Sequence, residues 1–281
     1  MDATLKASWS ERIFINRNTF LLTTGQVISQ TGSAMFRIGF IWILYIITGS
    51  KTTTGFIAMT AYLPSLIFGL FMGVLVDRYN RRSLMVGMDV VRAGLVLLIP
   101  LLHQQGMLTP VYLGLITFAV AMCNTVFLPA RDSIITSIVP PDRRLQANSL
   151  IQTSWQYAAL VAPLAAAALL HVTSESGLFV ADSVTYLISA LFIGRLLLPR
   201  DSCCDAERKG SRLLSDVMEG FRFALSRPAI LILLVITAVD NFFLMGPAHI
   251  GGMLFVREVL GQGAAVYALM GTAHAIGMIT S

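Results

Sequence analysis

The chain has 281 residues, of which 56% are hydrophobic and only 12% are charged, and its mean hydropathy is +0.74. A soluble globular domain carries about 25% charged residues, so this composition excludes an ordinary soluble fold. The same figures, with only three cysteines, exclude a disordered chain, a collagen-like chain and a disulfide scaffold. We therefore expect an all-α polytopic membrane protein.

Eight apolar runs approach the length of a membrane-spanning helix, which needs about 20 mostly apolar residues. In chain order they cover residues 20–48, 55–76, 84–102, 110–128, 145–170, 178–198 and 230–255, and an eighth begins near residue 264. Short polar connectors separate most of them. The pattern predicts a multi-pass helical protein.

The basic residues alternate between the two sides of the predicted membrane. With a cytoplasmic N-terminus, sixteen of the twenty Lys and Arg residues fall on that side, two (Lys51 and Arg257) on the other, and two (Arg37 and Arg92) inside helices. Cytoplasmic loops are enriched in Lys and Arg, so this asymmetry predicts that orientation in the cytoplasmic membrane. The net charge of +5 is thus a topology signal, and we expect no nucleic-acid partner.

One connector is long and polar, and it divides the chain. We expect a six-helix transmembrane bundle over residues 1–198 and a cytoplasmic linker over 199–228. Apolar residues recur at helical spacing over 213–225, which predicts a helix on the membrane surface. Residues 229–281 are then the incomplete start of a second bundle, so that the chain looks truncated at its C-terminus.

A specific motif follows the second apolar run. It reads GVLVDRYNRR and contains Gly73, Asp77, Arg78, Arg81 and Arg82. Together with Gly69, Gly73 forms a small-residue face that lets another helix approach closely. Positive charge alone does not require this spacing of glycine, acid and arginines.

This motif closely resembles the major facilitator superfamily signature G-x-L-x-D-R-x-G-R-R/K, and departs from it only at Asn80. The segments 29–50, 62–73, 129–150 and 181–192 look like the drug- and siderophore-exporting branch, which includes macrolide efflux and enterobactin export proteins. The resemblance implies a two-bundle fold with substrate bound between the halves. It also implies a cytoplasmic latch of Asp77, Arg78 and Arg81 with an acid at the end of helix 4, for which Asp132 is the positional candidate.

The fifth apolar run echoes a glycine-rich exporter motif. Its spacing survives here with Ser or Ala in place of every glycine, as at Ala158 and Ala162 beside Pro163. Small residues still allow close helix packing. The motif supports an export function only through this resemblance.

Polar side chains form stripes inside three predicted helices. They are Gln26, Gln30, Ser33 and Arg37; Asn148, Gln152 and Trp155; and Asp182, Thr185 and Ser189. Lipid offers no hydrogen-bond partner to these side chains, so we expect each stripe to face the bundle interior or a water-filled cavity. A substrate role and simple interhelical hydrogen bonding are equally compatible with this pattern.

Two charges lie well within the first and seventh helices. Each of Arg37 and Asp240 costs about 2.5–3.5 kcal/mol to insert, so each needs a partner or water. We expect Asp240 to be a proton-coupling or substrate-cation site with Arg37 as its counter-charge, and a structural ion pair is the alternative. Asp89 and Arg92, three residues apart, read as a local or latch-supporting ion pair.

We expect a monomeric secondary transporter that exports a small amphipathic or drug-like molecule, with the proton as coupling ion and alternating access. Direction and ion come from the resemblance. The sequence holds no P-loop, nucleophile–base pair or metal-ligand cluster, so we expect no ATP drive, no enzyme, no cofactor and no metal. The alternative is a non-transporting membrane sensor or an inactive, truncated remnant of such a transporter.

Overall fold

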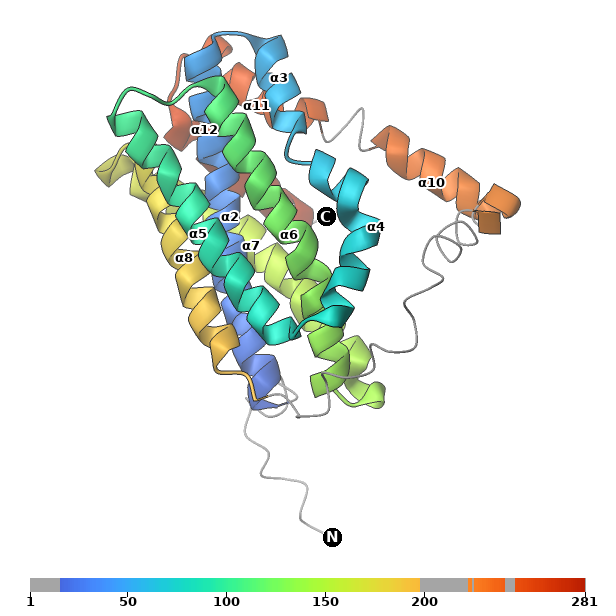
Figure 1. The fold of residues 1–281 in the computed structure, drawn as a ribbon. Coiled ribbons are helices and arrows are strands. Elements are labelled where there is room, and N and C mark those ends of the chain that lie inside the picture. Colours follow the sequence, from blue (N-terminus) through green and yellow to red (C-terminus); the bar gives the residue numbers. More distant parts are fainter. Residues whose placement is uncertain (1–15, 198–221, 224, 241–245, 281) are drawn as a thin grey trace.

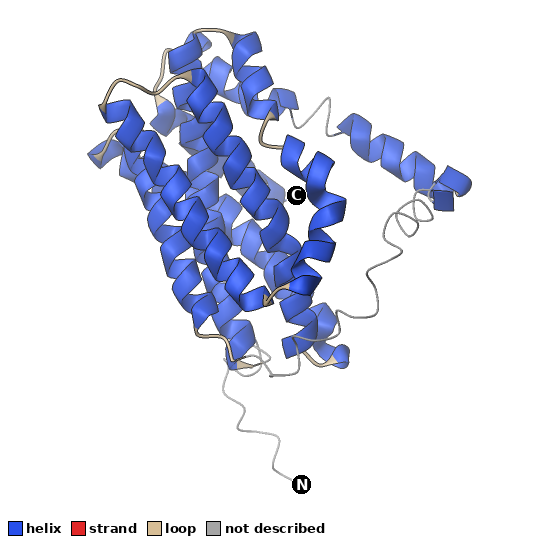
Figure 2. Ribbon diagram, viewed as in Figure 1, coloured by secondary structure: helices blue, strands red, loops and turns tan. Residues whose placement is uncertain are grey.

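The computed structural model describes residues 16–197, 222–223, 225–240 and 246–280. Within these ranges the regular elements are all helices, and no strand occurs among them (Figure 2). The helices are α2 (Arg17–Thr48), α3 (Lys51–Met59), α4 (Leu63–Arg78), α5 (Arg81–Gln104), α6 (Pro110–Ile138), the 3-10 turn η1 (Pro141–Arg143), α7 (Arg144–Val172), α8 (Ser176–Gly194), α10 (Pro228–Asp240), α11 (Gly246–Leu254), the π-helix η4 (Phe255–Val259) and α12 (Ala264–Thr280). The prediction of an all-helical protein is confirmed.

Five helical segments are long and apolar enough to cross a membrane: α2, α5, α6, η1 with α7, and α8. They correspond to the first, third, fourth, fifth and sixth predicted spans. Several begin where the sequence offers a capping side chain. Asn16 Oδ1 accepts from the backbone N–H of Thr19 at 2.8 Å before α2, and Asn80 Oδ1 accepts from that of Ser83 at 3.1 Å before α5.

The second predicted span is interrupted. Residues 60–62 form a turn between α3 and α4, in which the Tyr62 N–H bonds the Met59 carbonyl at 3.0 Å. Pro64 follows in the first turn of α4. Because proline has no N–H and disfavours a helical residue before it, a continuous helix is broken at this point. The expected single span is therefore two helices.

Helix α2 is the centre of the first bundle and packs against both α8 and α7 (Figure 1). Its glycines recur every seven residues on the side of α8. A Cβ atom at Gly25 would lie 3.2 Å from Phe192, and one at Gly39 would lie 3.2 Å from Leu178. At Gly32 it would collide with α8 outright. Three glycines on one face thus set the close approach of the two helices.

The remaining helices extend outwards from this pair. Helix α5 packs against α8 and α6, α4 packs against α6, and α12 packs against α7. The contact between α7 and α12 also uses small residues, since Ala162, Ala166 and Ala268 are all fully buried in one cluster. Ala158, Ala162 and Pro163, which the sequence predicts to pack against another helix, are buried, whereas a Cβ atom at Gly69 would meet nothing within 4 Å.

The segments after the linker differ from one another. Helix α10 stands apart from the bundle in Figure 1, and its described side chains are exposed except for the partly buried Ile230. Helices α11 and α12 lie against the bundle. The predicted seventh span, 230–255, falls on α10 and α11, and residues 241–245 between them lie outside the described residues. So does most of the predicted surface helix over 213–225.

Candidate functional site: a buried polar core and an exposed polar face

A charged pair is buried in the middle of the first bundle. Arg92 on α5 donates from Nη2 to Asp89 Oδ1, and both side chains are almost completely excluded from solvent. Arg92 Nη1 also donates to Asn124 Oδ1 on α6 at 3.3 Å. The guanidinium lies between two aromatic rings, 4.3 Å from the centroid of Phe127 and 4.5 Å from that of Tyr186. Burial of the charges is therefore offset by an ion pair, hydrogen bonds and two cation–π contacts.

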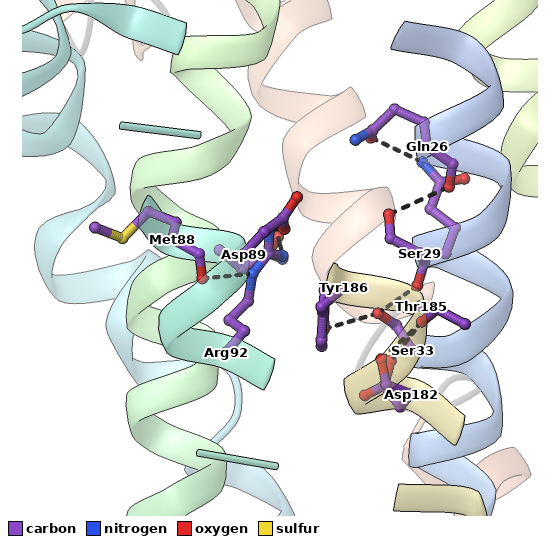
Figure 3. A network of polar contacts seen from close by, with 11 residues as sticks. Gln26, Ser29, Ser33, Met88, Asp89, Arg92, Asp182, Thr185 and Tyr186 are labelled. Carbon is purple, nitrogen blue, oxygen red and sulfur yellow. Dashed lines mark hydrogen bonds and ion pairs between the residues drawn. The ribbon is translucent and has the colours of Figure 1, made fainter. Parts of the chain in front are cut away.

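Tyr186 connects this pair to α2. Its hydroxyl lies 2.8 Å from Ser33 Oγ, and Ser33 Oγ itself donates to the Ser29 carbonyl at 2.9 Å. Figure 3 shows the Tyr186 side chain between the Asp89–Arg92 pair on one side and Ser33 with Asp182 on the other. The aromatic ring thus separates two polar groups that belong to different helix interfaces.

Asp182 lies at the contact of α8 with α2 and is 0% exposed. Its Oδ1 accepts a long hydrogen bond from Thr185 Oγ1 at 3.5 Å, and its Oδ2 has no hydrogen-bond partner among the described residues. A Cβ atom at Gly32 would lie 1.9 Å from Thr185 Oγ1 and 2.7 Å from Asp182 Oδ1. The absence of a side chain at position 32 is what leaves room for these two groups.

Two glutamines of α2 form a second buried group. Gln26 is 2% and Gln30 is 7% exposed, and Gln30 Nε2 donates to Gln26 Oε1 at 3.3 Å. The other amide atoms, Gln26 Nε2 and Gln30 Oε1, find no hydrogen-bond partner in the described part of the chain. These two predicted cavity residues are therefore inside the bundle in this conformation.

Arg37 behaves differently from the polar residues that precede it on α2. It is exposed although it lies far from either end of the helix, and no hydrogen bond or ion pair joins it to a described residue. Its electrostatic neighbours are Tyr186, Tyr62, Asp182 and Tyr267. The structure thus places an accessible cation in a membrane-spanning helix. Its predicted partner Asp240 is the last residue of α10, and that side chain lies outside the described residues.

The polar stripe of α7 is open to solvent. Asn148 and Gln152 are exposed, and Trp155 is 41% exposed. The opposite side of the same half of the helix is buried, as at Ala147 and Ser154. Of the three predicted stripes, this one lies on a surface of the described structure.

The predicted inner latch is described in part. The surroundings of Gly73 and the side chains of Asp77 and Arg78, in the second half of α4, lie outside what the structure describes. Arg82 donates from Nη2 to the carbonyl of Gly194 at the end of α8.

The positional candidate for the latch acid, Asp132, has another partner in this conformation. Its Oδ1 accepts from Arg131 Nη2 at 2.8 Å and from Arg131 Nε at 3.0 Å. In the described structure Asp132 thus pairs with Arg131, the residue before it on α6.

A further cluster of charges, which the sequence did not predict, joins the far end of the first bundle to η4. Lys51 Nζ lies 2.5 Å from Glu258 Oε2, and Tyr45 Oη donates to Glu258 Oε1. The Arg257 guanidinium lies 5.0 Å from the ring centroid of Tyr45 and 5.5 Å from that of Trp42. The only signal in the sequence is that Lys51 and Arg257 are the two basic residues assigned to the outer side.

Charge pairing at this cluster shifts the pKa values of its exposed groups. The hydrogen bond from Lys51, and then that from Tyr45, holds the pKa of Glu258 below its usual range. The same contact with Glu258 raises the pKa of Lys51. No group of three or more metal-ligating side chains lies close together within the described ranges.

The fold and these sites define a polytopic helical membrane protein with charged and polar groups inside its spans. The family model of the Major Facilitator Superfamily matches residues 22–281. The chain therefore belongs to this superfamily of transporters, as its signature motif predicted.

Individual relatives are distant. The chain is 26% identical over 184 residues to "Macrolide efflux protein A" of Streptococcus pyogenes, a match that covers 64% of this chain and 45% of that protein. It is 24% identical over 155 residues to a "Na(+), Li(+), K(+)/H(+) antiporter" of Planococcus maritimus, covering 55% of this chain and 36% of that protein. The matches thus span about half or less of these relatives' length.

A solved structure shares the fold. The crystal structure of a bacterial homologue of the human lysosomal transporter Spinster, in an inward-facing and occupied conformation, superposes with a TM-score of 0.73 at 16% identity. The superposition covers 98% of this chain and 61% of that one. The predicted fold class is confirmed.

Proposed function

We propose that the protein is a secondary active exporter of small amphipathic or drug-like molecules in the cytoplasmic membrane. The observation that carries this proposal is the exposed polar and aromatic face of α7, with Asn148, Gln152 and Trp155, in a chain similar to a macrolide efflux protein. Amide groups in a spanning helix need water, a partner helix or a ligand, because lipid offers no hydrogen bonds. An amphipathic cargo supplies both an apolar body and polar contacts.

Proton antiport with alternating access is the proposed mechanism. Exposed Arg37 and, at the end of α10, Asp240 are the charges proposed to respond to a proton or to a charged cargo. The similarity to a cation/proton antiporter supports a proton as the coupling ion. The two bundles then rock about a site between them.

The inner ends of the helices are proposed to carry the conformational latch. Asp77, Arg78, Arg81 and Asp132 form this latch by resemblance to the family signature. The contact of Arg82 with the end of α8 supports it, because this contact joins the first turn of α5 to another helix of the same bundle. We also propose a cytoplasmic N-terminus, from the distribution of basic residues, and a division into residues 1–198, 199–228 and 229–281.

Transport into inverted membrane vesicles tests the proposal. Vesicles containing the 281-residue chain, loaded with a proton gradient of acidic interior, are expected to accumulate radiolabelled erythromycin, and a protonophore should abolish the accumulation. Vesicles from cells that carry the empty vector are the control. If the vesicles contain the folded chain but accumulate no more label than this control, for erythromycin and for a panel of other labelled drugs, the result favours the sensor or the remnant instead.

A further inference from the structure

Asp182 is a carboxyl group without a compensating charge in contact. It is fully buried between α2 and α8, and the long hydrogen bond from Thr185 is its only side-chain contact of that kind among the described residues. Its second oxygen has no hydrogen-bond partner there. An ionised carboxylate in such a site is costly, and a buried acid without a partner is commonly neutral.

Arg92 on α5 interacts electrostatically with Asp182 but has another ion-pair partner. Arg92 pairs with Asp89, and the Tyr186 ring covers one face of its guanidinium, on the side of Asp182 (Figure 3). Asp89 and Arg92 together carry no net charge when both are ionised. Asp89 therefore offsets part of the Arg92 charge that acts on Asp182.

Arg37 on α2 is a second arginine that interacts electrostatically with Asp182. It is exposed, and has neither an ion pair nor a hydrogen bond to any described residue. Among the described residues, the charged and titratable neighbours of Asp182 are Arg37 on α2, Asp89 and Arg92 on α5, and Tyr186 on α8. Asp182 and Arg37, which has no ion pair with any residue that the structure describes, thus lie at the boundary between the buried core and the exposed side of α2.

We propose that Asp182 is a proton-binding group of the first bundle and that Arg37 is the cation whose charge it neutralises when the proton leaves. The proton passes from the carboxyl oxygen to water, and the carboxylate that remains is stabilised by Arg37. When Asp182 binds a proton again, Arg37 is left as an uncompensated cation on the accessible side.

This arrangement makes proton binding and the binding of a cationic cargo mutually unfavourable. An uncompensated Arg37 repels a positively charged amphipathic molecule, whereas an Arg37 neutralised by Asp182 does not. The assignment to an amphipathic organic cation rests on the proposed export function. The proton-binding role of Asp182 does not rest on it.

Infrared spectroscopy of the full chain in lipid nanodiscs tests the proton site without any transport. The wild-type protein should show, at neutral pH, the carbonyl stretching band of a protonated carboxylic acid, and Asp182→Asn should lose it. Asp142→Asn, which removes an exposed acid on η1, should keep the band. Arg37→Gln should move the disappearance of the band to higher pH. A wild-type protein without this band at neutral pH, or a band that persists in a folded Asp182→Asn variant, overturns the assignment.

Transport then tests the consequence for cargo. In vesicles, Asp182→Asn should lose proton-driven accumulation of tetraphenylphosphonium while it keeps exchange of labelled for unlabelled cation, if less rapidly than wild type. Unchanged proton-driven accumulation in Asp182→Asn contradicts the coupling role of Asp182. Absence of exchange in the wild-type protein instead contradicts the export function, and the infrared result stands independently of it.

Discussion

Helices α7 and α8 both pack against α2, and both carry a polar stripe, yet the two stripes lie in opposite environments. On α8, Asp182 and Ser189 are completely buried against neighbouring helices. On α7, Asn148 and Gln152 are exposed on the same half of the bundle as buried Ser154. Polar periodicity thus identifies a polar face of a helix, while the neighbouring helices decide whether that face is buried or exposed.

The physical difference lies in what each helix meets on α2. The α8 stripe lies opposite Gly32, where the missing side chain leaves space for Asp182 and Thr185. On α7, Ala162, Ala166 and Ala167 pack in one cluster with Ala34 and Met35 of α2, whereas Asn148 and Gln152 lie exposed in the half of the helix before Pro163. A buried stripe is suited to hold a proton, and an exposed one is suited to meet a cargo.

The largest expected effect concerns the buried charge next to the α8 stripe. Arg92→Leu leaves Asp89 as an isolated buried charge, which should lower the free energy of unfolding by about 3–5 kcal/mol. Thermal unfolding of the purified protein, followed by circular dichroism, measures it. Arg143→Ala is the control, because its contact with Asp142 is exposed and 4.0 Å long and should be worth about 0–1 kcal/mol. Equal unfolding temperatures for the two variants would contradict the buried-core assignment.

A smaller loss is expected at the α2–α8 contact. The methyl group of Gly32→Ala would lie 1.9 Å from Thr185 Oγ1, so the helices must separate, at a cost of about 1–3 kcal/mol. Gly94→Ala on α5 is the matched control, since a Cβ there meets nothing within 4 Å and alanine favours a helix. The same unfolding assay compares them. A Gly32→Ala protein as stable as Gly94→Ala would mean that the helices do not approach as described.

The exposed stripe should affect transport more than stability. Gln152→Ala removes an exposed amide, so the free energy of unfolding should change by less than about 0.5 kcal/mol, while vesicle accumulation of erythromycin should fall. Thr136→Ala, an exposed change on α6, should leave both quantities unaltered. If Gln152→Ala transports as well as Thr136→Ala, the α7 face does not contact the cargo.

The smallest effect is expected at the exposed cluster that joins α3 to η4. The pKa of Glu258 is lowered and that of Lys51 is raised by their contact, so both groups are charged at any pH between the lowered pKa of Glu258 and the raised pKa of Lys51. The stabilisation from Glu258 is present above its ordinary pKa and is lost as the pH falls through its lowered pKa, below about pH 4. The contribution of Lys51 is lost only as the pH rises through its raised pKa, above about pH 10.

Trp42 fluorescence reports on this contact, because Arg257 lies over its ring. In a variant with Trp9 and Trp155 changed to Phe, acidification should alter the Trp42 emission. Adding Glu258→Gln should produce the altered emission already at neutral pH and remove the acid transition. An acid transition that is unchanged by Glu258→Gln would assign it to another group.

Much of the architecture could be predicted from local patterns. Apolar run length predicted the spans, and the signature around Asp77 and Arg81 predicted the superfamily. The interruption of the second span was missed, although Pro64 is its local cause. Periodicity indicated that Asp182 and Gln152 lie on polar faces, but only the positions of α2, α7 and α8 show which of them is buried.

Contacts between distant segments were beyond this reasoning. Lys51 and Glu258 are separated by 207 positions, and no local pattern relates them. Asp89 and Arg92 were expected to pair, but the enclosure of Arg92 by Phe127 and Tyr186 needs three helices to be placed together.

Thiol labelling tests the contrast between the two helices most directly. Ser149 on α7 and Ser189 on α8 each lie five residues from the same end of the bundle, and the first is exposed while the second is completely buried. In a chain whose three native cysteines are changed to Ala, Ser149→Cys in membrane vesicles should react rapidly with a water-soluble maleimide. Ser189→Cys, and Ser154→Cys on the buried side of α7, should stay unlabelled until the protein is unfolded. Equal labelling rates at positions 149 and 189 in the folded protein would contradict the contrast between an exposed α7 stripe and a buried α8 stripe.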